Sequence, residues 1–221
     1  MRNRFVLVAA AVVAVLTVLA GPATASPSGG APAAGSGTCT DVRLSGELPV
    51  PPAGMSARQE VSVGADCVAH PGAVRLVPAS VRSAVRTSAT AASATTARQV
   101  HSWSEMYDCC HILMTALYTT TTWDTVDGQV TGAATEVGTH NNREPWDAGW
   151  YVRTSGRTEA GAEVTAHAEF GYQGIFDATG LWYANTHDTS VRLHGDGTAA
   201  CRFDVVLRHT FIGWNAVRGC S

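Results

Sequence analysis

A loop between two expected strands holds the side chains best suited to bind a ligand. Over residues 140–150 the sequence HNNREPWDAGW brings amides, a guanidinium group, carboxylates and two indoles together. A sugar site needs such groups, because a flat aromatic face covers the apolar side of a pyranose and polar groups bind its hydroxyls. The candidate ligand-binding residues are Asn141, Asn142, Arg143, Trp146 and Trp150. The alternative is an ordinary polar connection in which Trp150 begins the next strand and is buried.

A second candidate site is a polar strand face that carries one imidazole and two carboxylates. Within residues 162–172, Glu163, His167 and Glu169 alternate with apolar residues and therefore share one face. Same-side neighbours on a strand lie about 6.5–7 Å apart, so His167 and Glu169 could share a proton or a metal ion. The pattern fits the acid–base pair of a small hydrolase, and it also fits the solvated face of an amphipathic strand.

The cysteines are even in number, which is typical of exported chains with disulfides. They are Cys39, Cys67, Cys109, Cys110, Cys201 and Cys220. We expect Cys39 to bond Cys67, because the two bound one short segment. A bond between the adjacent Cys109 and Cys110 would be strained, so we expect these two to bond the last two cysteines, in an order that stays open. No C-x-x-C spacing occurs, which disfavours a thiolate metal site or a redox pair.

The other histidines show no metal-binding pattern. No H-E-x-x-H motif is present, and the sequence predicts neither a metal site nor a cofactor. His187-Asp188 and His194-x-Asp196 flank one short expected strand, where they fit turn positions best, although they could converge. His209 falls on the apolar face of its strand, where we expect a hydrogen-bonded core histidine.

The elements that must position these side chains are β-strands. Residues 201–211 and 162–172 alternate apolar and polar side chains with a period of two, which predicts strands with one buried face. Further strands are expected at 101–107, 112–122, 129–137, 149–155, 181–186 and 190–194. The apolar run at 112–117 could equally be a buried helix. About eight short strands separated by turn signals predict an all-β domain, an antiparallel sandwich or partly closed barrel.

The chain divides by composition into an export signal, a leader, two β regions and a connection. Residues 1–25 have a basic start, an apolar run and an A-T-A site, the pattern of a secretory signal peptide. No later run is long and apolar enough for a membrane helix, so no membrane insertion is expected after cleavage. The expected boundaries are 26–38 for a flexible leader, 39–78 for a small disulfide-closed β segment, 79–99 for an Ala/Ser/Thr-rich linker and 100–221 for the all-β domain. The linker could also be a processing site.

Composition narrows the function more than any motif does. The formal net charge of −3 argues against nucleic-acid binding, which depends on clustered cations. The absence of lysine excludes a Schiff base, a P-loop and a Ser-Lys dyad. We therefore expect a secreted, non-catalytic binding module with an extracellular glycan or protein target. The alternatives are a small extracellular hydrolase and a structural component of a secreted assembly; the oligomeric state stays open.

Overall fold

The described part of the chain contains strands and no helix. The computed structural model describes residues 38–79, 98–143 and 149–221. The expected signal peptide, most of the expected leader and linker, and Trp146 lie outside these residues. Within the described ranges, no helix is long and apolar enough to cross a membrane.

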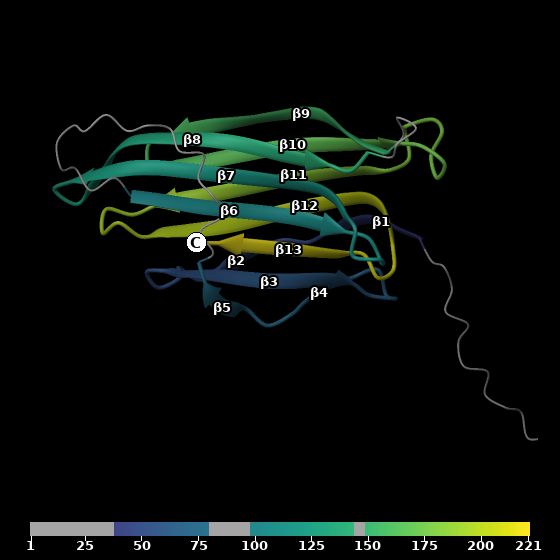
Figure 1. Ribbon diagram of the computed structural model, residues 1–221, viewed down its shortest axis with the longest axis horizontal. Coiled ribbons are helices and arrows are strands. Elements are labelled where there is room, and N and C mark those ends of the chain that lie inside the picture. Colours follow the sequence, from purple (N-terminus) through teal and green to yellow (C-terminus); the bar gives the residue numbers. More distant parts are fainter. Residues whose placement is uncertain (1–37, 80–97, 144–148) are drawn as a thin grey trace, which may run out of the picture. The chain divides into compact units, whose positions relative to one another are not determined.

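The strands form two antiparallel sheets that pack face to face as a sandwich, as expected (Figure 1). Sheet A contains β1 (Thr38–Arg43), β2 (Gly46–Leu48), β9 (Gly149–Ala160), β10 (Glu163–Gln173), β11 (Ala184–Leu193) and β12 (Ala199–Phe211). Sheet B contains β3 (Met55–Val63), β4 (Ala69–Pro71), β5 (Arg75–Pro78), β6 (Arg98–Tyr107), β7 (Leu113–Val126), β8 (Gln129–Asn141) and β13 (Asn215–Cys220). Their orders are β1-β12-β11-β10-β9 and β4-β3-β13-β6-β7-β8, with β2 on β12 and β5 on β3.

The N-terminal β segment joins both sheets of this sandwich. Strands β1 and β2 pair with β12, and β3 pairs with the C-terminal strand β13. The described residues from 38 to 221 accordingly belong to one compact unit. Both sheets therefore depend on strand pairs between residues more than 150 positions apart, such as Ser62 opposite Asn215.

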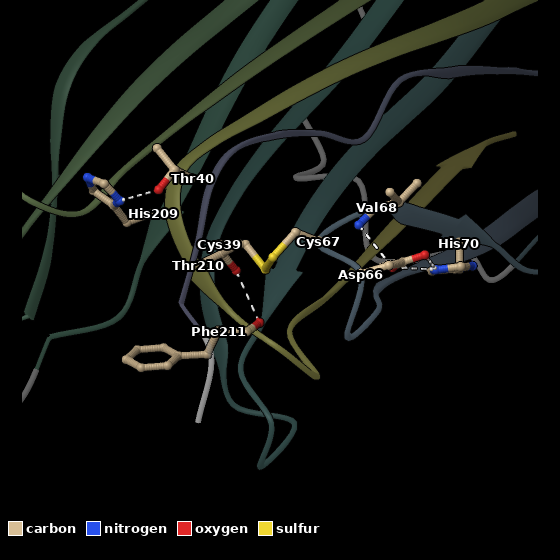
Figure 2. Close-up of a disulfide and its surroundings, with 9 residues drawn as sticks. All are labelled: Cys39, Thr40, Asp66, Cys67, Val68, His70, His209, Thr210 and Phe211. Atoms are coloured by element: carbon tan, nitrogen blue, oxygen red, sulfur yellow. Dashed lines mark hydrogen bonds and ion pairs between the residues drawn. A yellow bond between two sulfur atoms is a disulfide. The ribbon is translucent and has the colours of Figure 1, made fainter. Parts of the chain in front are cut away.

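The disulfides confirm one expected pair and correct the others. Cys39 bonds Cys67, which ties the start of β1 to the turn between β3 and β4 (Figure 2). Cys201 bonds Cys220, whereas Cys109 and Cys110 are unbonded and exposed, so the expected bonds between these two pairs are wrong. The physical reason is that β12 and β13 follow one another in the chain but lie in opposite sheets. Their inward-facing cysteines therefore meet across the core.

The inner faces of the sheets combine two apolar clusters with buried polar groups. One cluster includes Met106, Leu117 and Phe170, and the other includes Trp123 and Phe203. The buried polar side chains on the inner faces of β6, β7, β8 and β11 are Ser102, Ser104, Thr115, Thr119, Thr121, Thr135, Asn185, His187 and Thr189. Hydrogen bonds from His187 and Asn185 to Ser104 and Thr115 cross between the sheets, so these polar groups restrict how the two sheets can align.

His187 is the central residue of this polar layer, and the expectation that it lies in a turn is wrong. It sits within β11, fully buried, and the expected strands at 181–186 and 190–194 are replaced by this single strand. Its Nδ1 lies 3.0 Å from Ser104 Oγ and its Nε2 3.0 Å from Thr115 Oγ1, both on the opposite sheet. Burial lowers the pKa of His187 to about 3, so the ring is neutral in the folded protein at neutral pH.

Arg218 is a buried cation whose hydrogen bonds within the described residues go to a side-chain amide oxygen and a backbone carbonyl oxygen. Its Nε and Nη2 donate to Gln59 Oε1 at 3.0 and 2.6 Å, and its Nη1 donates to the Leu44 carbonyl at 3.4 Å. Burial lowers the pKa of this guanidinium. Gly46 leaves the space that the guanidinium fills, because a Cβ on Gly46 would collide with Arg218.

We expect Gly46→Ala to lower the free energy of unfolding by about 1–3 kcal/mol, the usual cost of overpacking a core. Denaturant unfolding measures the effect. The loss should be smaller in an Arg218→Met background, because the flexible thioether can yield to the added methyl group. Gly156→Ala is the matched control, since nothing lies within 4 Å of a Cβ at that strand position. Equal losses at Gly46 and Gly156 would contradict the packing argument.

Candidate functional site

The three most exposed large apolar side chains of the described residues lie on one loop, together with a half-exposed tryptophan. Residues 174–183, here called the apolar loop, connect β10 to β11 at the end of the sandwich that also holds the turn between β12 and β13 (Figure 1). Ile175, Phe176, Leu181 and Trp182 are 72%, 66%, 70% and 50% exposed. Several large apolar side chains exposed on one short loop are candidates for an interaction surface.

Asp177 fixes the backbone of the apolar loop. Its Oδ1 accepts hydrogen bonds from Thr179 N, Thr179 Oγ1 and Gly180 N at 3.1, 2.6 and 3.0 Å. Its Oδ2 accepts from the backbone N–H groups of Trp182 and Tyr183 at 2.7 and 3.2 Å. Burial alone would raise the pKa of Asp177, but these hydrogen bonds together lower it to about 2. One carboxylate therefore holds the backbone at both sides of the loop turn.

A cluster of aromatic rings, here called the aromatic base, packs against the apolar loop; it consists of Tyr172, Tyr183, His209 and Trp214. Tyr172 and Tyr183, at its two ends, pack edge to face with centroids 6.1 Å apart, and Tyr183 lies 6.1 Å from Trp214. Trp182 stacks on His209 at 3.9 Å, with the rings within 11° of parallel. His209, whose Nδ1 lies 3.3 Å from Thr40 Oγ1 (Figure 2), is therefore a half-buried support and not the core histidine we expected.

Two arginines hold the loop backbone from the side. Arg153 Nη2 donates to the Gly180 carbonyl at 2.9 Å, and Arg208 Nη1 donates to the Leu181 carbonyl at 3.0 Å. Arg153 also forms an ion pair with Glu169 at 3.1 Å. These cations thus stabilise the loop backbone at two successive carbonyl groups.

Removing the Asp177 carboxylate should loosen the apolar loop. We expect Asp177→Ala to speed amide hydrogen exchange at Gly180, Trp182 and Tyr183 by at least about tenfold, because their N–H groups lose a charged acceptor. Hydrogen exchange measured by NMR checks this. The same carboxylate makes the loop sensitive to acid: its pKa is lower when folded than the ordinary 3.8, so its stabilisation is complete above about pH 4 and falls away towards pH 2.

Asp196→Ala is the matched control for this prediction. Asp196 caps the turn between β11 and β12 by accepting from Thr198 N at 2.9 Å and Thr198 Oγ1 at 2.7 Å. Its loss should leave exchange in the apolar loop unchanged. If the amide groups of the apolar loop exchange as slowly in Asp177→Ala as in the parent protein, the aromatic base alone orders the loop.

The ligand site expected between residues 140 and 150 does not form an exposed aromatic platform in the described residues. Trp150 is buried in β9, with its ring packed against Tyr172 and Trp214, so its face cannot stack on a sugar. This outcome matches the alternative in which Trp150 begins the next strand. Asn141 Nδ2 donates to the Trp150 carbonyl, and the Asn142 carbonyl accepts from Trp150 N. Arg143 forms a backbone bridge with Gly149, and Trp146 lies outside the described residues.

Within the described part of the chain, the three residues of the expected acid–base site, His167, Glu163 and Glu169, each interact with a different residue and not with one another. His167 Nδ1 lies 2.8 Å from Asp188 Oδ1, directly across β10 and β11, on the exposed face of sheet A. Glu169 instead pairs with Arg153, and Glu163 Oε1 accepts from Ser190 Oγ at 3.3 Å. A shallow groove of about 590 Å³ follows this face and is lined by Glu163, Asp188 and Arg202 among others. The arrangement is a polar strand face on which His167 and the two glutamates each interact with a different residue.

The sequence pattern of the apolar loop differs from the alternation of apolar and polar residues that identifies the strands. The apolar pairs Ile175-Phe176 and Leu181-Trp182 flank the turn residues Asp177-Ala178-Thr179-Gly180. Large apolar residues on both sides of a turn, outside the alternating strand pattern, have no inner face to occupy. Such residues are candidates for an exposed contact surface.

The candidate site therefore consists of the apolar loop, its Asp177 support and its aromatic base. Within the described ranges, no group of three or more His, Cys, Asp or Glu side chains is placed to hold a metal ion. In comparisons with known proteins, no protein family, curated protein or solved structure matches this chain.

Proposed function

We propose that this protein is a secreted, non-catalytic binding module that contacts an extracellular protein through the apolar loop. The observation that carries the proposal is the exposure of Phe176, Leu181 and Trp182 on a backbone that Asp177 already orders. Two disulfides are typical of an oxidising, extracellular type of environment. The signal-peptide pattern at residues 1–25 adds support for export.

A protein target fits the chemistry of this loop better than a glycan. Aromatic anchors surrounded by a polar rim are typical of protein interfaces, where a few buried aromatic residues carry most of the affinity. One face of Trp182 is already covered by His209, and the nearby Arg153 and Arg208 donate to loop carbonyls. Fewer polar groups are therefore free to bind sugar hydroxyls. Because Asp177 holds the loop backbone, little conformational entropy is lost on binding.

Panning a phage-displayed peptide library on the immobilised full chain tests this function. Peptides selected this way should lose at least about 30-fold in affinity for Phe176→Ser with Trp182→Ser, since one interface anchor contributes 2 kcal/mol or more. Leu76→Ser with Val126→Ser is the matched control, because these side chains are 50% and 52% exposed but lie outside the loop. Unfolding curves of both double variants confirm that the fold is intact.

Two further probes decide between target classes. The same variants are applied to a glycan array and to vesicles of phosphatidylcholine with phosphatidylglycerol. If the parent protein binds a glycan or the vesicles and the loop variant does not, the target is a glycan or a membrane surface and not a protein. Peptide binding that the loop and control variants weaken equally would reject the apolar loop as the contact surface.

A further inference from the structure

The turn between β6 and β7 presents two adjacent thiols to solvent. Cys109 and Cys110 are both exposed, and their sulfur atoms lie 3.7 Å apart. Asp108 closes the turn: its Oδ1 accepts from Cys110 N and Ile112 N, both at 2.8 Å. His111 N donates to the Asp108 carbonyl at 3.1 Å, and His111 adopts a left-handed φ of 60°. The backbone thus holds the two side chains beside each other.

The remaining cysteines of the chain are already paired. Cys39 is bonded to Cys67 and Cys201 to Cys220, and all six cysteines lie in the described residues. An oxidant that closes these bonds, two members of which are fully buried, also reaches the exposed thiols of the turn. Within the folded chain, the nearest sulfur available to each of these thiols is therefore its own neighbour.

We propose that Cys109 and Cys110 bond to each other, forming a disulfide ring within the turn that opens and closes reversibly. One protein thiolate attacks a small disulfide such as oxidised glutathione, forms a mixed disulfide and releases one glutathione thiol. The neighbouring thiolate then attacks the protein sulfur of that mixed disulfide and releases the second glutathione. The two protein thiols are oxidised, one glutathione disulfide is reduced to two thiols, and the protons of the cysteines pass to the products.

The two attacks need no fixed order, because either sulfur can donate the hydrogen bond between the thiols. Whichever thiol forms the mixed disulfide, its neighbour closes the ring. Closure within one turn needs a sulfur movement from 3.7 Å to about 2 Å, whereas a bond to a second molecule must be formed from bulk concentration.

This ring is expected to be easier to reduce than the other two disulfides. Adjacent Cα atoms lie about 3.8 Å apart, below the usual range of about 4.4–6.8 Å for bonded cysteines, and such departures favour reduction. The two structural disulfides have Cα separations of 5.3 and 6.0 Å, within that range. A mild reductant should therefore open the turn while the sandwich stays crosslinked.

Peptide mapping of the full chain, purified without reductant and alkylated with N-ethylmaleimide after denaturation, tests the proposal. We expect no alkylation at Cys109 or Cys110 and a peptide lighter by two hydrogen atoms than its reduced form. Graded dithiothreitol should add two alkyl groups to this peptide before it opens the other two bonds, which serve as controls in the same digest. Cys109→Ser and Cys110→Ser should each leave one alkylated or glutathione-bound thiol.

Three outcomes would overturn the proposal. The first is complete alkylation of both thiols in protein that was never reduced and was then exposed to oxidised glutathione. The second is a peptide that links either residue to another cysteine of the chain or to a second molecule. The third is simultaneous opening of all three bonds during graded reduction, which would contradict the easier reduction of the turn.

Discussion

Replacing Cys201 and Cys220 together by alanine is expected to lower the free energy of unfolding by about 3–5 kcal/mol. This bond joins β12 of sheet A to β13 of sheet B and closes a loop with a sequence separation of 19. Its loss frees the unfolded chain and also removes two fully buried sulfur atoms from one of the apolar clusters. Denaturant unfolding of the parent and variant proteins measures the difference.

The second disulfide provides the comparison for this prediction. Cys39 and Cys67 close a longer loop, with a sequence separation of 28, but Cys67 is exposed. Replacing both by alanine should cost about 2–3 kcal/mol, because the entropic contribution is similar and less core packing is lost. A larger loss for this pair than for the inter-sheet pair would show that packing at Cys201 and Cys220 adds nothing.

The strands were predictable where one face is uniformly apolar. β12 and β10 follow the alternation of residues 201–211 and 162–172, and residues 113–117 of the ambiguous run at 112–117 lie in the strand β7. β11 was not predictable as one strand, because His187, Asp188 and Thr189 interrupt its apolar pattern. Ser104 and Thr115 on the opposite sheet make His187 an acceptable core residue, and partners 83 and 72 positions away are invisible to a local pattern.

The site was harder to predict than the fold, because exposure depends on packing. Trp150 and Trp182 both lie beside polar or turn residues in the sequence, yet only Trp182 is half exposed. Trp150 is buried because Tyr172 and Trp214 enclose it, and those residues come from β10 and from the turn after β12. Likewise, Asp188 became the partner of His167 only through the register of β10 on β11. Residue types identified plausible sites, but sheet order decided which of them reach the surface.

The buried imidazole of His187 should make the protein lose stability in mild acid. Its folded pKa of about 3 lies below the ordinary value of 6.5, so the unfolded chain binds a proton that the folded chain does not. Stability is therefore highest above pH 6.5 and falls by roughly 1 kcal/mol per pH unit as the pH drops towards 3. We expect His187→Gln, which cannot titrate, to remove roughly 2 kcal/mol of the difference in unfolding free energy between pH 6.5 and pH 4.5.

Comparing how steeply the unfolding free energy of the parent and of His187→Gln changes with pH isolates the contribution of this residue from that of the other titrating groups. Burial also lowers the pKa of His101, but that residue is present in both proteins and its contribution cancels. Asp177 contributes only below about pH 4, outside the chosen range. Chemical denaturation at each pH gives the two slopes, and parallel slopes would contradict the prediction. A His187 ring that titrates near pH 6 in NMR spectra of the folded protein would also do so, because the sandwich would then accommodate a charge between its sheets.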